Sequence, residues 1–317
     1  MQQEEVRSLV YALQQNIRKV IVGKDDAIEL ALIALLCRGH VLIEDVPGVG
    51  KTTLVASLAR SLDCSFKRIQ FTPDVMPSDI TGFTMPSLST GQMEFKPGAV
   101  MSQIVLADEI NRTSPRTQSS LLEVMEEGQV TVDGITHPLP RPFMVLATQN
   151  PVDFVGTYPL PEAQMDRFFM RITIGYPSVE EEMDVLERYS GQVSPLAALK
   201  PICSAQDVIG MQEQVMTVYC SPEVRSYVAS IAAATRSHPQ LTLGISPRGA
   251  IALLRAAQAC AVLMGRDYVL PDDIRNMVVP VLSHRLVLSP DARMKGQNAQ
   301  NLLMGLLPGI PVPGQRA

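Results

Sequence analysis

The chain has 317 residues, of which 46% are apolar and 19% are charged, and this length and composition exclude both a disordered chain and a disulfide-stapled miniprotein. The net charge of −5 gives no general attraction to nucleic acid or to an anionic membrane. The five cysteines form no Cys-x-x-Cys pair, so we expect reduced thiols. Because the first residues lack a signal pattern and the most apolar early run, residues 27–37, is short and contains Glu29, we expect a cytoplasmic protein without membrane insertion.

The residue pattern changes near residue 176. Residues 1–176 alternate short apolar runs with helical stretches, whereas residues 177–317 have helical patterns and almost no strand signal. The predicted strands are residues 41–44, 68–71, 103–107, 143–148 and 169–174. They mostly lack polar alternation, which is typical of a parallel sheet covered by helices on both faces. We therefore predict an α/β core over residues 1–176 and a smaller all-α domain over residues 177–317.

A glycine-rich loop lies between the first predicted strand and a helix. Residues 45–52 read DVPGVGKT, a P-loop in the setting that this motif requires. Its backbone N–H groups can surround phosphates, Lys51 can reach the β- and γ-phosphates, and the Thr52 hydroxyl can bind Mg²⁺. Asp45 replaces the first glycine of the strict motif, so its carboxylate must point away from the phosphates. The predicted nucleotide-binding residues in this segment are Pro47, Gly48, Val49, Gly50, Lys51, Thr52 and Thr53.

Asp108 and Glu109 follow the third predicted strand, where a P-loop protein carries its second acidic motif. We expect Asp108 to hold Mg²⁺ through water, and Glu109 to orient and deprotonate the attacking water. The chain contains no Asn-Lys-x-Asp motif for guanine, so the expected cofactors are ATP and Mg²⁺.

Two more polar side chains are candidates for phosphate sensing. Asn150 follows the strand predicted over residues 143–148; if this strand lies beside the one before Asp108, the amide can hold the attacking water or the γ-phosphate. Arg248 lies in the first turn of a helix that Ser246 caps, where a cation opposes the helix dipole, and phosphate binding would offset that penalty. The alternatives are a plain Asn-Pro turn and a solvated arginine.

These motifs resemble those of AAA+ ATPases, and more narrowly the MoxR family, whose P-loop commonly reads E-D-x-P-G-x-G-K-T. The resemblance continues through residues 21–23, 70–74, 77–82, 107–112, 121–127, 147–151, 156–168 and 246–248. It implies a five-stranded core with a helical lid, assembly into a homo-oligomeric ring, expected to be a hexamer, and ATP-driven remodelling or metal-cofactor maturation of client proteins. A partner with a von Willebrand factor A domain is also implied.

The same resemblance assigns roles to further residues. Arg167 corresponds to the arginine finger, which meets a neighbouring subunit's γ-phosphate, and Arg171 is the other candidate. Val22 and Gly23 are expected to contact adenine. The four histidines are scattered, and we expect them at caps or on the surface rather than in a metal site.

Two predicted hairpins, residues 83–95 and 130–137, separate the competing functions. The second has Asp133-Gly134 as a two-residue turn suited to type I′. Related rings use such hairpins on DNA, but neither segment contains Lys or Arg, which argues against a DNA motor. A magnesium-chelatase-like ATPase subunit would differ only in its partner. The joint presence of Glu109, Asn150 and Arg167 argues against a scaffold that binds ATP without turnover.

Overall fold

The fold is organised around one parallel β-sheet. A computed structural model describes residues 1–317 except 88, 90, 151–155, 192 and 315–317. The sheet has the order β2-β5-β8-β1-β9, and every neighbouring pair is parallel. Its strands are β2 (Phe66–Gln70), β5 (Ile104–Asp108), β8 (Met144–Gln149), β1 (Val41–Glu44) and β9 (Met170–Ile172). All five predicted strands are confirmed, with ends that differ by at most two residues.

Helices cover both faces of this sheet because successive strand residues point to opposite sides. On one side, Val41, Ile43 and Leu146 belong to a buried cluster with residues of α1 (Gln3–Arg18), α2 (Asp25–Leu36) and α3 (Lys51–Ser61). On the other side, Leu42 and Val145 belong to a second cluster with residues of α4 (Pro77–Thr81) and α5 (Pro115–Glu127). The apolar strands are therefore buried on both faces, as the absence of polar alternation predicted.

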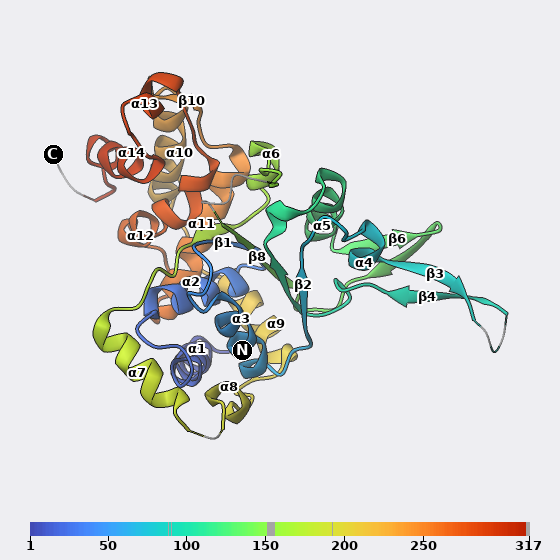
Figure 1. Cartoon of the computed structure of the whole chain (residues 1–317). Coiled ribbons are helices and arrows are strands. Elements are labelled where there is room, and N and C mark those ends of the chain that lie inside the picture. Colours follow the sequence, from blue (N-terminus) through green and yellow to red (C-terminus); the bar gives the residue numbers. More distant parts are fainter. Residues whose placement is uncertain (88, 90, 151–155, 192, 315–317) are drawn as a thin grey trace.

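Both predicted hairpins are present. The first pairs β3 (Gly82–Pro86) with β4 (Met93–Pro97), and the second pairs β6 (Gln129–Val132) with β7 (Ile135–Pro138). Asp133 and Gly134 both have positive φ, as a type I′ turn requires. The rings of Phe95 and His137 stack with centroids 3.9 Å apart, and the two hairpins project together from the body of the molecule (Figure 1).

The C-terminal part is mainly helical. Its helices are α7 (Val179–Tyr189), α8 (Pro195–Ala198), α9 (Ala205–Val215), α10 (Pro222–Arg236), α11 (Pro247–Leu263), α12 (Pro271–Leu282), α13 (Pro290–Met294) and α14 (Ala299–Leu306). It also contains a short antiparallel pair, β10 (Leu241–Leu243) and β11 (Val287–Leu288), which the all-α prediction for residues 177–317 missed. The short helix α6 (Glu162–Met165) precedes β9, and 3₁₀ turns lie at Ile110–Arg112, Ser283–Arg285 and Leu307–Gly309.

The two parts of the chain share a core. Residues of α9 to α12 lie in the same buried cluster as α1 and α2, so packing does not mark a break at residue 176, and the proposed domain boundary stays a prediction. All five cysteines are free. Over the described part of the chain, no helix is long and apolar enough to cross a membrane.

Candidate nucleotide-binding site

The P-loop lies at the carboxyl end of β1, between Glu44 and the start of α3 at Lys51. Gly48 and Gly50 have φ of +88° and +91°, a backbone conformation that residues with a side chain rarely adopt. Apart from the adjacent residues, no part of the chain that the structure describes lies within 4 Å of the position that a Cβ would take at either glycine. Lys51 Nζ donates a 2.7 Å hydrogen bond to the Asp45 carbonyl oxygen. The loop thus has open space at both glycines, as a phosphate cradle needs, and its lysine is held by the backbone of the loop itself.

Asp45 turns its carboxylate away from the loop, as the sequence analysis required. Its Oδ2 accepts hydrogen bonds from the backbone N–H groups of Ile174, at 2.7 Å, and of Gly175, at 2.6 Å. Its Oδ1 accepts a bond from the N–H of Val46. The aspartate therefore ties the start of the P-loop to the chain that leaves β9, a role that a glycine could not fill.

The acidic pair lies near the P-loop lysine. Burial lowers the pKa of Lys51, while the charges of Asp45, Asp108 and Glu109 oppose that shift. The Thr148 hydroxyl donates a 2.6 Å hydrogen bond to Asp108 Oδ1 and accepts a 2.8 Å bond from the Glu109 backbone N–H. Glu109 has φ of +57°, and Thr148 is fully buried. One hydroxyl thus fixes both acidic residues, which sequence analysis did not foresee.

Strand β2 supplies partners for the same two carboxylates. Arg68 Nη2 lies 2.6 Å from Asp108 Oδ2, and Gln70 Nε2 donates a 2.9 Å bond to Glu109 Oε2. Arg112 also forms an ion pair with Glu109, with Nε and Oε2 3.3 Å apart. Sequence analysis placed Gln70 in a family motif without a role, and it missed Arg68.

The strands that precede Asn150 and the acidic pair are neighbours in the sheet, as predicted. β5 and β8 are neighbouring parallel strands, with Ala107 opposite Ala147. Asn150 follows β8 directly and is 6% exposed. Its role in sensing phosphate stays a prediction.

The residues fit a divalent cation. The carboxylate of Asp108 and the hydroxyl of Thr52 are hard oxygen donors of the kind that Mg²⁺ prefers. Asp108 already accepts a cation in this structure, the Arg68 guanidinium, which shows that positive charge is accommodated at Oδ2. Mg²⁺ bound here would neutralise charge on the phosphates of a nucleotide.

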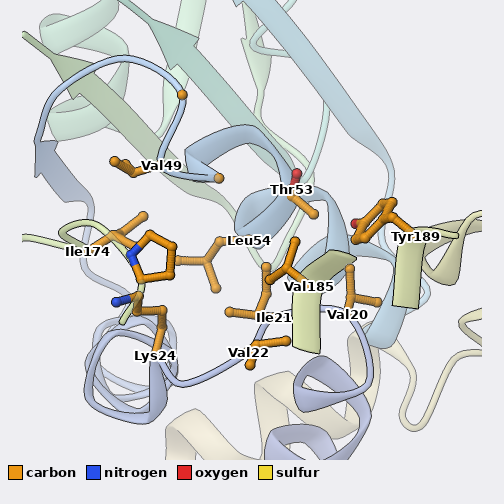
Figure 2. Close-up of a pocket in the computed structure, with 13 residues that line it drawn as sticks. Val20, Ile21, Val22, Lys24, Val49, Thr53, Leu54, Ile174, Val185 and Tyr189 are labelled. Carbon is orange, nitrogen blue, oxygen red and sulfur yellow. The ribbon is translucent and has the colours of Figure 1, made fainter. Parts of the chain in front are cut away.

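A cavity of about 320 Å³ adjoins the P-loop. Figure 2 shows that its walls come from distant segments: Val20, Ile21, Val22 and Lys24 after α1; Gly48, Val49, Gly50, Thr53 and Leu54; Ile174 and Pro177; and Val185 and Tyr189 of α7. The lining is mostly apolar and suits the faces of a purine ring. Val22 lines the cavity as predicted. Gly23 has φ of +66° and lies against the Glu181 side chain, which leaves no room for a Cβ.

Sequence analysis missed the contribution of α7 to this cavity. The only signal was an amphipathic helix after the Gly175-Tyr176-Pro177 break, with Val185 and Tyr189 on its inner side. Lys24 joins the two walls, because its Nζ contacts Glu181 Oε2 at 3.3 Å and donates to the Tyr176 carbonyl oxygen at 2.9 Å.

Arg167 and Arg248 do not lie at this site. Both pair with Glu126 at the end of α5, each at 3.0 Å. They line a cavity of about 220 Å³ with His40, which precedes β1, whereas the P-loop follows β1. Because a strand rises about 3.3 Å per residue, the four residues of β1 separate the two ends by roughly 13 Å. These arginines therefore lie near the end of β1 that is opposite to the P-loop of their own chain.

Arg171 lies neither in the cavity beside the P-loop nor in the cavity that Arg167 and Arg248 line. Its Nη1 lies 2.6 Å from Glu44 Oε2, and its Nη2 donates to the Ser283 hydroxyl at 3.2 Å. These partners belong to the same chain. Both arginines are thus paired within the chain, but Arg167 also lines the cavity beside Arg248 and Arg171 does not.

The expectation that the histidines lie at caps or on the surface is wrong for two of them. His40 and His284 are buried. His40 Nδ1 accepts a hydrogen bond from the Val145 N–H, so Nε2 carries the proton and donates to the Met125 carbonyl oxygen. Burial lowers the pKa of His40 to about 4. His40 therefore joins β1, β8 and α5 as a neutral side chain.

The chain is similar to several known proteins. Residues 40–170 match the ATPase family associated with various cellular activities (AAA), and residues 233–303 match the AAA lid domain. The chain is 50% identical over 315 residues to YeaC of Bacillus subtilis, which covers 99% of this chain and 98% of that protein. It is 41% identical to Chaperone MoxR1 of Mycobacterium tuberculosis, over 98% of this chain and 83% of that protein. A solved structure from Cytophaga hutchinsonii superposes with a TM-score of 0.92 at 38% identity, over 98% of this chain and 96% of that chain.

Proposed function

Because the chain belongs to the MoxR family of AAA+ ATPases, we propose that it hydrolyses ATP to ADP and phosphate with Mg²⁺ as its cofactor. The observation that carries the proposal is that three features lie together at one edge of the sheet. These are an open P-loop with Lys51, the acidic pair at the end of β5, and an apolar cavity of nucleobase size.

The chemistry follows from the positions of these groups. Phosphoryl transfer needs charge neutralisation and an oriented nucleophile more than covalent help. Lys51 supplies a fixed positive charge at the phosphates. Glu109, held at its backbone by Thr148, is placed to orient a water molecule and to accept its proton. Asn150, at the end of the neighbouring strand, can hold the same water or the γ-phosphate.

A homo-oligomeric ring explains the position of the distant arginines. Arg167 and Arg248 lie together near the end of β1 that is opposite to the P-loop of their own chain. In a head-to-tail ring, this end of one subunit faces the nucleotide of the next, so each subunit completes its neighbour's site. We propose a hexamer in which both arginines act across the interface.

We further propose that the ring remodels client proteins, in the manner of a chaperone. One relative carries the name Chaperone MoxR1, which supports this class of function. The hairpins expose Phe83, Met93 and Ile135, apolar side chains that suit contact with a polypeptide. Metal-cofactor maturation and a partner with a von Willebrand factor A domain remain part of the same proposal.

Two variants test the proposed hydrolysis. Lys51→Ala removes a ground-state contact to the phosphates and should abolish ATP binding, while Glu109→Gln should keep binding and lose turnover. Nucleotide affinity by fluorescence titration and steady-state phosphate release are measured separately. Arg116→Ala, on the exposed face of α5, is the control and should behave as the wild type. Equal losses of affinity in the first two variants would contradict the assigned roles. The ATP-trapped Glu109→Gln protein is also suited to capture of clients.

A further inference from the structure

Helix α7 has two faces with different environments. Its inner face holds Val185 and Tyr189 against the nucleotide cavity. Its outer face carries Val179, Met183 and Leu186, which are 73%, 65% and 67% exposed. The spacing of four and three residues places these three side chains in one stripe. An amphipathic helix normally packs its apolar stripe on the core, but none of the residues that the structure describes covers this stripe.

Carboxylates border the stripe on both sides. At 100° per residue, Glu182 lies along one edge, and Glu180 and Glu187 lie along the other. All three are exposed. The outer surface of α7 is therefore an apolar strip between two acidic edges.

A surface of complementary character lies beside the residues that follow α2, whereas α7 contacts Lys24 at the start of that helix. Arg248, Ile251 and Arg255 form an outward ridge on the first turns of α11, since they are spaced by three and four residues. Ile251 is 57% exposed, and Met216, which contacts Arg255, is 50% exposed. Arg38 lines the same cavity as this ridge. Glu126 pairs with Arg248 in this cavity, but Arg38, Arg167 and Arg255 leave the surface with an excess of cations around its apolar side chains. The charge on this surface is therefore opposite to that on α7.

We propose that the outer stripe of α7 docks on the α11 ridge of a neighbouring copy of this chain. The proposal rests on the ring described above, and it extends the interface beyond the arginines. α7 is a wall of the cavity that adjoins the P-loop, so a neighbour whose Arg248 reaches the phosphates brings the next turns of α11 close to α7. Ile251 and Arg255 lie about 5 and 10 Å further along that helix.

This arrangement couples the nucleotide to assembly through one helix. The base contacts the inner face of α7, and the neighbour contacts the outer face. A nucleotide that orders α7 from its inner face reduces the conformational entropy that the neighbouring subunit must remove when it binds the outer face. The same coupling acts in the opposite direction. Nucleotide should therefore strengthen the ring, and the ring should strengthen nucleotide binding by the same factor.

The first experiment removes the stripe. The double variant Met183→Ser/Leu186→Ser changes side chains that are already exposed, so the fold should persist. Both stripe changes are made in the Glu109→Gln protein, and assembly with ATP is measured by sedimentation velocity. The protein concentration at which half of the chains are assembled should rise at least about tenfold relative to Glu109→Gln alone. The affinity of the dilute monomer for ADP should stay within about twofold. Met294→Ser, at an 81% exposed site on α13, is the matched control and should assemble normally.

The second experiment tests the charge pairing. Glu187→Arg and Arg255→Glu should each weaken assembly, because each places like charges across the interface. The variant with both changes should recover at least part of the loss. Such recovery is specific to two surfaces that meet, since a merely structural defect in either helix would add rather than cancel.

The outcomes separate this proposal from the ring itself. If the stripe variant assembles as readily as its parent, or if the two charge changes add without recovery, the α7 contact is wrong although the ring stands. If the parent protein remains monomeric with ATP, both the ring and the contact are wrong. If the stripe variant assembles normally but loses a captured client, the stripe serves a different partner and the proposal is overturned.

Discussion

Thr148 and Asp108 are joined by a 2.6 Å hydrogen bond in a fully buried position, and the same threonine hydroxyl accepts the backbone N–H of Glu109. Asp108 is the proposed Mg²⁺ ligand and Glu109 the proposed base, and Thr148 restrains the carboxylate of the first and the backbone of the second. Thr148 therefore acts as a positioning residue, and its loss should affect turnover more than nucleotide binding.

Replacement of Thr148 tests this positioning role. Thr148→Val keeps the shape of the side chain and removes both hydrogen bonds, so we expect hydrolysis to fall about 10- to 100-fold, as with other residues that orient a metal ligand. The affinity for ADP without Mg²⁺ should change little. Thr148→Ser keeps the hydroxyl and should restore most of the activity. Steady-state kinetics and ADP titrations decide the matter, and equal activity of the Val and Ser variants would rule out the role.

Thr148 illustrates which residues of the site could not be predicted from the sequence. The strands and the P-loop could be predicted because their signals are local: apolar runs, glycines, and a Lys-Thr pair at a helix start. Thr148 and Arg68 reach Asp108 from strands that are 40 residues away in the chain. Only the sheet order brings them together, and no local pattern encodes that order.

The cavity lining and the burial of His40 also depend on tertiary contacts that the sequence does not reveal locally. Val185 and Tyr189 line the cavity because α7 folds back over the turn after α1, a tertiary contact that an amphipathic pattern alone does not locate. His40 was expected at a cap or on the surface because the four histidines are scattered along the chain. It is buried because the end of α5 covers it and β8 supplies its second partner.

Asp45 should contribute to stability as well as to the shape of the P-loop. Asp45→Gly restores the usual motif but leaves the N–H groups of Ile174 and Gly175 without their acceptor, so we expect the free energy of unfolding to fall by about 1–3 kcal/mol. Asp45→Asn keeps one acceptor oxygen and should lose less. Urea denaturation of the three proteins measures this order. A Gly variant as stable as the wild type would show that water replaces the carboxylate at no cost.

His40 should make the fold sensitive to mild acid. Its pKa is about 4 in the fold, below the ordinary value near 6.5, because burial penalises the charged form of the ring and the nearby Arg248 charge adds to that penalty. The unfolded chain therefore binds more protons between these two values. This contribution to stability is fully present above pH 6.5 and is lost as the pH falls to about 4, amounting to roughly 3 kcal/mol.

A variant isolates this effect from the other titrating groups. His40→Gln cannot titrate, so its stability should be lower at neutral pH but should change less between pH 6.5 and 4 than that of the wild type. His284 is also buried with a lowered pKa and remains in both proteins, so it cancels in the comparison. Denaturant titrations at several pH values give the two slopes. Parallel slopes would exclude His40 as the source.

The last prediction concerns the two arginines near the end of β1 that is opposite to the P-loop. Arg167 and Arg248 share Glu126 and lie beyond β1 from their own P-loop, so each should act on a neighbour's nucleotide. Arg167→Ala should nearly abolish hydrolysis, since a missing finger costs about 10³-fold or more where it stabilises the transition state. Lys51→Ala should be inactive for a different reason, the loss of phosphate binding.

Mixing the two inactive proteins distinguishes action across an interface from action within one chain. A Lys51→Ala subunit still carries its arginines, and an Arg167→Ala subunit still carries a complete P-loop, so some mixed interfaces regain both parts. Hydrolysis should rise well above the sum of the separate proteins, and Arg248→Ala should be rescued in the same way. Sedimentation of the mixture with ATP verifies that mixed rings form. If they form and activity stays at the sum, Arg167 does not act in trans, and Arg171 would first have to leave Glu44 and Ser283 to replace it.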